Sequence, residues 1–590
     1  MNTNFITFTC LPILLVLSGC GHAEEKAAPD PVLPQSPVHV ASISTRNLQP
    51  HGINSHVGDL DRSNLELNYR SYVEIKPDLL GASQVTYPRV KQLSDGRYIL
   101  FYQDGHIGWN IYYSQSNDGK VWSRGRELFS SYRVENNTDD RCFATCDALI
   151  LQNGDILAVS SFRTNMGFYT NLAGNGIMMR RSRDNGRTWD AEQIVYQGSN
   201  WEPYLLQLPD GKIQLYFTDA NTATWSSGTS LIESQDNGQT WSPALGSAPY
   251  KIIRQITKYE GGEPVYTDQM PCAILLNDGH TLAAVLESCL ADGSYWITMA
   301  YAEDDWVHLS GTEEGPADRQ SNLFVGAGGY LVQFPSGETA VSYNDSESLL
   351  SIRMGDEQAR NLREPYRPFK GYGYWGTMEV TGGHTVMASM HASMASSQNM
   401  IMVGECVLNH GVEAPLQSVW VDGDNSDWDG VDQALFIGSN SPVQGLFRFS
   451  HDRDHVYVCV DLLDESVSAS DYVVLELDRL SSSERPSENA LRVRLNSRNA
   501  RTVSRFSDGA WTESADLSLE SACRQSDEQA TAPEDRGCIW ELSVPKAVLG
   551  LSDGDRLLFH ATLSDAQYGM DTFSNTSDVA ADTWLPVTLK

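Results

Sequence analysis

A repeated pairing of apolar runs organises the middle of the chain. Each unit has an apolar run typical of a β-strand, a turn that ends in Gly, and a second apolar run. Asp-Gly and Asn-Gly turns between such runs indicate β-hairpins, because these residues accept the positive φ that tight turns need. The turns are Leu93–Gly96, Leu151–Gly154, Leu208–Gly211, Leu276–Gly279, Phe334–Gly337 and, more weakly, Val380–Gly383.

The spacing of these hairpins predicts the architecture. Successive turn glycines are 58, 57, 68, 58 and 46 residues apart, which leaves room for four short strands in each unit. Units that each bury one sheet against the next need radial closure, so six copies over residues 70–405 predict a six-bladed β-propeller. A β-sandwich with coincidental turns is the alternative.

A second repeat has the pattern Ser-x-Asp-x-Gly-x-Thr-Trp. It is complete at Ser182–Trp189 and Ser234–Trp241, and Gln115–Trp122 is a degenerate copy with Asn117 at the aspartate position. Glu303–Trp306 is interpreted as a remnant. The aspartate can hydrogen-bond the turn backbone and the Trp can pack between neighbouring sheets, so these aspartates are predicted to be structural. The pattern is the Asp-box, and it resembles that of sialidase-type propellers.

The last third of the chain has a different pattern. The hairpin period stops after Cys406, and Val456–Asp464 alternates apolar with polar positions in the manner of a β-strand. Residues 417–590 are therefore predicted to form a β-sandwich, which makes the fold class all-β: a six-bladed propeller followed by a sandwich. With its segment Val419–Trp428 and a strand ending in Asp, this part resembles carbohydrate-binding module family 9.

That resemblance implies that the sandwich binds sugar. Its candidate stacking faces are Trp511, Trp540 and Trp584, although a core position is the commoner role for any one of them. Asp422, Asp424 and Asp464 offer the hard oxygen ligands that a structural calcium ion prefers.

The N-terminal residues have a pattern typical of an export signal. Residues 6–19 form an apolar run that is too short to span a bilayer, and Leu17–Cys20 resembles the bacterial lipobox. Residues 1–20 are therefore predicted to be a lipoprotein signal that leaves Cys20 as the lipidated residue, and residues 21–69 to be a tether and lead-in. We expect an exported lipoprotein anchored to the outer membrane, on its periplasmic or cell-surface face.

Charge and cysteine content narrow the function. The chain of 590 residues has 76 acidic and 42 basic residues and a formal net charge of -34, so a nucleic-acid backbone would be repelled. Export makes disulfides feasible, with three close pairs as candidates, whereas the cysteine spacing without a His cluster disfavours zinc. The three pairs are Cys142/Cys146, Cys272/Cys289 and Cys523/Cys538.

The hairpin geometry locates the active face. Residues about eight before and eight after each turn Gly should finish at the same end of the blade and ring one mouth of the central funnel. A ring of carboxylates there favours an acid and a nucleophile or base acting on a glycosidic bond over a merely solvated rim. The positions before the turns are Arg89, Asp147, Glu202 and Gln269, and those after are Asp104, Phe162 with Arg163 beside it, Asp219, Glu287, Asp345 and His391.

Two family resemblances compete for the chemistry. Tyr87–Val90 resembles the sialidase motif that contains a substrate-binding arginine, but Ile213–Asp219 lacks the second arginine that a sialic acid carboxylate needs. The blades that follow instead resemble glycoside hydrolase family 93, the exo-acting arabinanases. The motifs that carry this second resemblance are Trp201-Glu-Pro203, Met270-Pro271, Asp278-Gly279 and Glu287.

The family 93 resemblance implies that Glu202 and Glu287 are the catalytic pair of a retaining mechanism. Glu202 is interpreted as the nucleophile and Glu287 as the acid/base, with Glu263 as a competing second carboxylate. The candidates for lining the substrate pocket are Arg89, Asp104, Asp147, Arg163 and Tyr343.

The predicted function is hydrolysis of a plant or algal polysaccharide, with arabinan as the first choice. Three alternatives stay open: an exo-sialidase whose arginine triad combines Arg89 with Arg319 or Arg353, a polysaccharide lyase with a Tyr or His base, and a glycan-binding lipoprotein without activity. We expect a monomer that needs no cofactor, with an oligo- or polysaccharide and the membrane as its partners.

Overall fold

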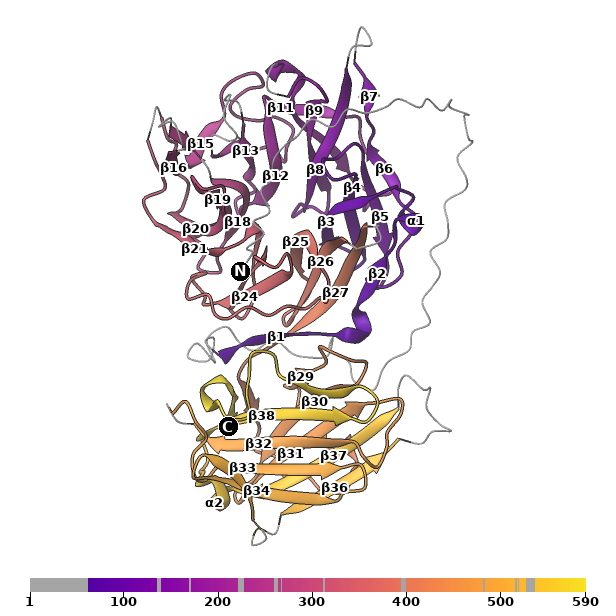
Figure 1. The fold of residues 1–590 in the computed structure, drawn as a ribbon, viewed down its shortest axis with the longest axis vertical. Helices are drawn as coiled ribbons and strands as arrows, with labels where there is room; N and C mark the ends of the chain where they lie inside the picture. The colour runs from indigo at the N-terminus through magenta and orange to yellow at the C-terminus, as the bar shows by residue number, and fades with distance from the viewer. Residues whose placement is uncertain are drawn as a thin grey trace, which may run out of the picture.

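The structure is a computed structural model that describes residues 62–590 apart from 135–138, 169–170, 221–227, 259–263, 267, 311–312, 394–398, 481–482, 515–516, 518 and 527–535. Cys20 and Glu263 lie outside the described residues. The described chain is built almost entirely from β-strands, as the alternation of apolar and polar positions predicts. Figure 1 shows two bodies, a propeller formed by the first two thirds of the chain and a sandwich formed by the last third.

Within the described residues, six antiparallel sheets form the propeller, and the first strand of each is its innermost. The sheets are β3 (Val85–Gln92), β4 (Tyr98–Asp104), β5 (Ile111–Ser116) and β6 (Arg126–Phe129); β8 (Asp140–Ile150), β9 (Ile156–Thr164), β10 (Gly176–Ser182) and β11 (Gln193–Gln197), with β7 (Tyr132–Arg133) beside β8; β12 (Asn200–Gln207), β13 (Ile213–Asp219), β14 (Thr229–Ser234) and β15 (Tyr250–Ile253); β18 (Asp268–Leu275), β19 (Thr281–Cys289), β20 (Tyr295–Glu303) and β21 (Arg319–Val325); β22 (Ala327–Gln333), β23 (Thr339–Asn344) and β24 (Leu350–Gly355); and β25 (Gly373–Val380), β26 (Thr385–Ser393) and β27 (Asn399–Asn409).

The inner strands close into a ring. Each of β3, β8, β12, β18, β22 and β25 packs against the next, and β25 packs against β3. The short strands β1 (Asn64–Leu67) and β2 (Val73–Ile75) pair with β27, so the last blade takes strands from both ends of the propeller sequence. The circle is thus closed by hydrogen bonds between segments more than 300 residues apart in the chain.

The hairpin turns and Asp-boxes have the predicted geometry. The turn glycines Gly96, Gly154, Gly211, Gly279 and Gly337 all have φ between 75° and 115°. In the loop Ser182–Trp189, Asp184 accepts hydrogen bonds from the Thr188 N–H at 2.9 Å and the Thr188 hydroxyl at 2.6 Å, and Trp189 packs on Phe101 of the preceding blade. These aspartates hold a turn, and the Trp joins two blades.

The degenerate copy differs from the prediction in one residue. Asp118, not Asn117, takes the aspartate position, because its Oδ1 accepts the N–H groups of Lys120 and Val121 at 2.9 Å. Between the aspartate and the Trp, this loop has one residue fewer than the complete copies. Counted back from Trp122, the aspartate position therefore falls on Asp118 instead of Asn117. In the remnant, Trp306 donates to the Tyr216 hydroxyl of the preceding blade at 2.8 Å.

The sandwich packs two sheets around one apolar core. The larger sheet has the order β28 (Val412–Ala414), β40 (Leu585–Leu589), β38 (Arg556–Asp565), β32 (Tyr472–Arg479), β33 (Leu491–Asn496), β34 (Arg501–Ser507) and β35 (Ala510–Glu513), with β39 (Gly569–Thr572) beside β38; the smaller has β29 (Leu435–Ile437), β30 (Gln444–His451), β31 (His455–Leu463), β37 (Gly537–Pro545) and β36 (Glu520–Gln525). Trp540 and Trp584 are buried, so they belong to the interior and do not stack on sugars.

Several smaller elements complete the described chain. The strands β16 (Ile256–Lys258) and β17 (Pro264–Tyr266) form a hairpin of their own. The helical pieces are single turns: α1 (Pro77–Leu80), α2 (Lys546–Leu549), and the 3-10 turns Tyr69–Ser71, Leu172–Gly174, Asn425–Trp428 and Ala581–Thr583. Over the residues that the structure describes, no helix combines the length and apolarity needed to cross a bilayer.

The eight described cysteines are free thiols, and the strands hold two of the three suggested disulfide pairs apart. Cys142 and Cys146 lie on one strand, β8, on either side of a bulge. Cys272 is paired with Val285 in the ladder, four residues from Cys289. Cys523 and Cys538 lie on neighbouring strands, and their thiols interact directly.

A buried carboxylate marks the junction of propeller and sandwich. Glu66 on β1 is fully buried and accepts hydrogen bonds from the Ser439 hydroxyl and the Ser574 N–H, both in the sandwich. Burial, with the nearby Asp571 charge, raises the pKa of Glu66 to about 8. Glu66 is therefore mostly protonated at neutral pH, and its ionisation disfavours the packed junction.

Candidate active site

Each inner strand carries a β-bulge at the same place. The ladder register shifts there in all six sheets, and the bulged residues have φ between 50° and 66°. Side chains other than Gly rarely adopt this φ, and such strain concentrates at functional sites. The bulged residues are Tyr87, Thr145, Glu202, Met270, Gly328 and Trp375, and the first five lie nine residues before a turn Gly.

Side chains from the second strands satisfy the N–H groups of these bulges. Thr218 accepts from the Met270 N–H at 2.8 Å, Glu287 from the Gly328 N–H at 2.7 Å, and Asn344 from the Trp375 N–H at 2.7 Å. Gln103 does the same for Thr145 at 2.8 Å. The second strands therefore contribute a ring of polar side chains next to the bulges: Gln103, Ser161, Thr218, Glu287, Asn344 and His391.

This ring corrects four of the residues predicted to surround the mouth. The ring positions follow the turn Gly by seven residues in four blades and by eight at Glu287 and His391. Counting eight in the other blades selects the opposite face of the strand, because side chains alternate. The residues displaced in this way are Asp104, Phe162, Asp219 and Asp345, each one place after its ring residue.

Glu202 and Glu287 come together on neighbouring blades. Thr218 connects the two blades. Its hydroxyl donates to Glu202 Oε2 at 2.7 Å and accepts the N–H of Met270, which lies on β18 in the same blade as Glu287. Glu287 accepts two hydrogen bonds, from the Gly328 N–H at 2.7 Å and from Gln269 Nε2 at 3.0 Å. The two predicted catalytic carboxylates are therefore both held in place by named donors.

Burial raises the pKa of both carboxyl groups, but the charges and hydrogen bonds around them differ. Burial, together with the Glu287 charge, raises the pKa of Glu202 to about 8, while the Thr218 hydrogen bond and Arg89 act in the opposite direction. Burial also raises the pKa of Glu287, but its two hydrogen bonds favour the ionised form. When the pair holds one proton, the arrangement therefore favours that proton on Glu202 and the charge on Glu287.

A layer of charged and aromatic side chains lies directly beneath the bulges. The guanidinium of Arg89 lies 3.9 Å from the centre of the Tyr87 ring and donates to the Trp375 carbonyl at 3.2 Å. Lys91 donates to the Tyr330 hydroxyl at 2.8 Å and lies 3.8 Å from Asp147. Arg89 and Asp147 are buried here, so they form the floor of the site rather than its lining.

Aromatic side chains form the wall of the site on the side of the last blade. The ring of Trp375 lies 5.7 Å from that of Tyr87, 5.0 Å from His106 and 5.3 Å from His391. Burial and the neighbouring His106 lower the pKa of His391 to about 3, so His391 is neutral at working pH. Its buried Nδ1 has no hydrogen-bond partner.

The other residues predicted to line the substrate pocket differ in their contacts. Arg163 stacks over Trp201, the neighbour of Glu202, with 5.6 Å to the ring centre. Asp104 and Tyr343 are engaged by other side chains. Asp104 accepts from the Ser83 hydroxyl at 2.9 Å, and Tyr343 accepts from Arg353 at 2.9 Å on the opposite face of β23 from Asn344.

The three arginines of the sialidase alternative are each engaged by groups of the protein itself. Arg89 is 3% exposed and its guanidinium binds backbone carbonyls. Arg319 is paired with the buried Asp268 at 2.8 Å, and Arg353 is packed over Phe324.

Sequence reasoning missed several residues of the site. Thr218, Trp375 and Tyr330 carry no motif, and an uncharged residue on a strand gives no chemical signal by itself. The nine-residue spacing between bulge and turn Gly, which recurs in five blades, would have found Thr145 as a position equivalent to Glu202.

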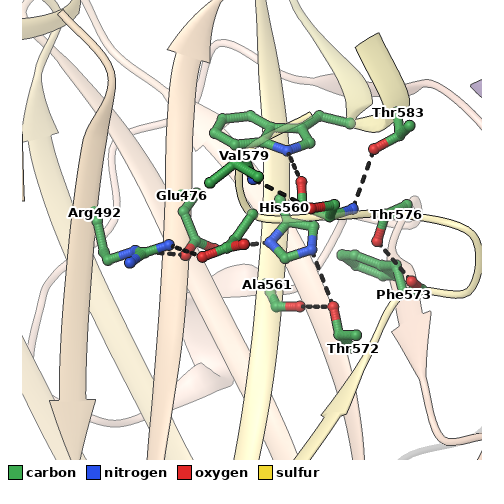
Figure 2. A network of polar contacts seen from close by, with 12 residues as sticks. Glu476, Arg492, His560, Ala561, Thr572, Phe573, Thr576, Val579 and Thr583 are labelled. Atoms are coloured by element: carbon green, nitrogen blue, oxygen red, sulfur yellow. Dashed lines mark hydrogen bonds and ion pairs between the residues drawn. The ribbon is translucent and has the colours of Figure 1, made fainter. Parts of the chain in front are cut away.

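A pocket of about 650 Å³ lies on the larger sheet of the sandwich. Figure 2 shows its polar network: His560 bonds Glu476 at 2.9 Å and Thr572 at 3.0 Å, and Arg492 donates to Glu476 at 2.8 Å. Arg492 also packs over Trp511, with 4.3 Å to the ring centre. The lining combines fixed hydrogen-bonding groups with flat faces, including Arg494 stacked at 3.7 Å on Tyr472.

Comparison with known proteins agrees with the propeller fold. Residues 82–284 match the family model of the BNR repeat-like domain. No curated protein matches the chain.

Solved structures are similar to parts of the chain at low identity. The α-L-arabinofuranosidase of Fusarium graminearum, a family 93 glycoside hydrolase solved with arabinobiose, is 18% identical; the match covers 57% of this chain and 96% of that one with a TM-score of 0.42. The intramolecular trans-sialidase of Ruminococcus gnavus is 10% identical, with coverages of 55% and 95% and a TM-score of 0.38. A family 9 carbohydrate-binding module from Caldicellulosiruptor kristjanssonii is 16% identical, with coverages of 30% and 93% and a TM-score of 0.25.

Proposed function

We propose that the chain is a glycoside hydrolase that cleaves a plant or algal polysaccharide, with an arabinan as the first candidate, through Glu202 and Glu287. The observation that carries the proposal is the buried carboxylate pair at the ring of bulges, in which one group favours the proton and the other the charge. An acid and an anionic carboxylate are what hydrolysis of a glycosidic bond requires.

The hydrogen bonds favour roles opposite to those inferred from the sequence. Glu202, with its raised pKa, protonates the leaving oxygen, while the Glu287 carboxylate attacks the anomeric carbon and forms a glycosyl-enzyme. Glu202 then takes a proton from water, and the resulting hydroxide displaces Glu287. The partly exposed Trp375 provides a flat apolar wall against which a sugar ring packs.

The test is a panel of arabinan, other plant and algal polysaccharides and a sialoside, incubated with the chain lacking residues 1–20. The proposal expects reducing sugar from a neutral polysaccharide, with NMR showing the anomeric configuration retained in the first product. Release of sialic acid would favour the sialidase alternative, and unsaturated products would favour a lyase.

The roles of the two carboxylates can be assigned separately. Azide should restore cleavage of an activated aryl glycoside by Glu287→Ala with inverted product, and by Glu202→Ala with retained product. Retained product from Glu287→Ala and inverted product from Glu202→Ala would instead make Glu202 the nucleophile.

The sandwich is proposed to bind a glycan at the pocket on its larger sheet. This rests on the exposed Arg494, stacked on the partly buried Tyr472, beside the fixed Glu476 network in the lining of the pocket. Titration calorimetry of Arg494→Ala and of wild type against soluble oligosaccharides tests it. Equal affinity of Arg494→Ala and wild type would exclude this pocket as the glycan-binding site.

The anchor is a separate proposal that rests on Leu17–Cys20 alone. The chain is proposed to be an outer-membrane lipoprotein with a diacylglycerol on Cys20. Radiolabelled palmitate should enter the wild-type chain in a bacterial host and be absent from Cys20→Ala, and labelling of both would contradict the assignment.

A further inference from the structure

Arginines gather on two strands of the larger sheet in the sandwich. Residues 489–507, which include β33 and β34, contain five arginines and no acidic residue, although the whole chain has a formal net charge of -34. A cluster of one sign in a chain of the other sign creates a local field that attracts anions. The five are Arg492, Arg494, Arg498, Arg501 and Arg505.

Two of these arginines line the pocket of about 650 Å³ on this sheet. Arg492 and Arg494 are two residues apart on β33, so their side chains leave the strand on the same face. Their ladder partners on β34, Ser504 and Thr502, also line the pocket. This lining is therefore a regular part of the sheet and does not depend on a loop.

Both acidic side chains of the lining are engaged by Arg492. Its Nε donates to Glu476 at 2.8 Å, and its Nη2 donates to Asp578 at 2.5 Å. His560 binds the second oxygen of Glu476 at 2.9 Å, as Figure 2 shows. Because Arg492 and the two carboxylates satisfy one another, they leave the second arginine of the pocket without a counter-ion.

Arg494 is that second arginine. Within the described part of the chain, its guanidinium forms no ion pair and no hydrogen bond with the protein. It lies 3.7 Å from the centre of the Tyr472 ring and is exposed to solvent. Stacking on the ring fixes the plane of the guanidinium and leaves its N–H edge available, which is the arrangement in which Arg binds an oxyanion through two parallel hydrogen bonds.

We propose that this pocket binds an acidic glycan and that Arg494 binds the carboxylate or sulfate group of the sugar. The inference rests on the proposed glycan pocket and adds the charge of its ligand. The hydroxyls of Thr502, Ser504 and Thr562 in the lining are suited to the neutral groups of the sugar. A recessed lining of this kind fits a sugar unit better than a flat anionic membrane surface.

The experiment uses isothermal titration calorimetry on the chain lacking residues 1–20. The ligands are trigalacturonate and its methyl ester, and a sulfated carrageenan oligosaccharide and its desulfated form, so that each acidic probe is matched by an uncharged one. Wild type should bind at least one acidic probe about 10- to 100-fold more tightly than its uncharged form, because a charge-assisted hydrogen bond is lost with the charge. The probe that shows the preference identifies the group as carboxylate or sulfate.

Three variants test the role of Arg494. Arg494→Gln should remove the preference, and Arg494→Lys should restore only part of it, because an ammonium group lacks the planar fork. Arg498→Gln changes an exposed arginine in the turn after β33, outside the pocket lining, and should keep the preference. If Arg494→Gln does not fold, the comparison of charged and uncharged probes on wild type still decides.

The outcomes separate this inference from the proposal on which it rests. Equal affinity of wild type for charged and uncharged probes, or an unchanged preference in Arg494→Gln, would overturn the acidic ligand while glycan binding itself would stand. If wild type bound none of the oligosaccharides, the glycan pocket and its acidic ligand would both be wrong. None of these results depends on the activity of the propeller.

Discussion

Thr218 offers a way to perturb the proposed acid without touching either carboxylate. Its hydroxyl donates to Glu202 Oε2 at 2.7 Å and accepts the Met270 N–H at 2.8 Å. Thr218→Val keeps the shape of the side chain and removes both hydrogen bonds. The hydroxyl lowers the pKa of Glu202, so its loss should make this carboxyl harder to ionise.

The magnitude follows from the two bonds. A hydrogen bond to a charged acceptor contributes about 1.5–3 kcal/mol, which corresponds to roughly one to two pH units. Activity that needs protonated Glu202 declines above its pKa of about 8, and the alkaline limb of kcat/KM in Thr218→Val should therefore move upward by about one pH unit. The unpaired Met270 N–H should also cost about 1–3 kcal/mol of folding free energy.

The assay is kcat/KM on the cleaved polysaccharide between pH 5 and 10, with thermal unfolding measured on the same samples. Thr218→Ser retains the hydroxyl and should keep the wild-type alkaline limb. An unmoved limb in Thr218→Val, or the same displacement in Thr218→Ser, would refute the link between this hydroxyl and the proton on Glu202.

Three further predictions concern other parts of the molecule. Glu66→Gln should unfold at higher temperature than wild type at pH 9 and at the same temperature at pH 4, because the folded-state pKa of about 8 exceeds the ordinary value and stability is lost as pH rises through this interval; equal curves at pH 9 would contradict it. Trp375→Ala should raise KM about tenfold with a smaller effect on kcat, since stacking contributes about 1–2 kcal/mol, and Trp375→Phe should recover most of the loss. Asp184→Ala should lower the free energy of unfolding by about 1 kcal/mol while kcat stays within twofold of wild type, as measured by denaturant titration and kinetics.

The architecture was accessible from the sequence because it repeats. Turn glycines with positive φ are required wherever a tight hairpin recurs, so Gly96, Gly154 and Gly211 mark blades without any knowledge of their contacts. The strands β1 and β2 were not predicted, because they complete a sheet whose other members lie more than 300 residues away. Nothing local in Asn64–Leu67 reveals that partner.

The site was only partly accessible. Short motifs singled out Glu202 and Glu287, which the structure brings to neighbouring blades, and the place before the turns singled out Arg89 and Asp147. Counting along strands failed at Asp104 because a displacement of one residue exchanges the two faces of a sheet. The bulges that turn Glu202 and Trp375 inward depend on side chains of neighbouring blades, such as Thr145 and Asn344, and these contacts exist only in the folded ring.

The most direct test of the central claim is product release from the cleaved polysaccharide by wild type, Glu202→Gln, Glu287→Gln and the surface control Asp210→Asn, all with confirmed folding. The account predicts that kcat falls at least a thousandfold in both glutamate variants, since each removes one half of the acid and nucleophile pair, and that Asp210→Asn matches wild type. Undiminished activity in either glutamate variant would contradict the two-carboxylate mechanism.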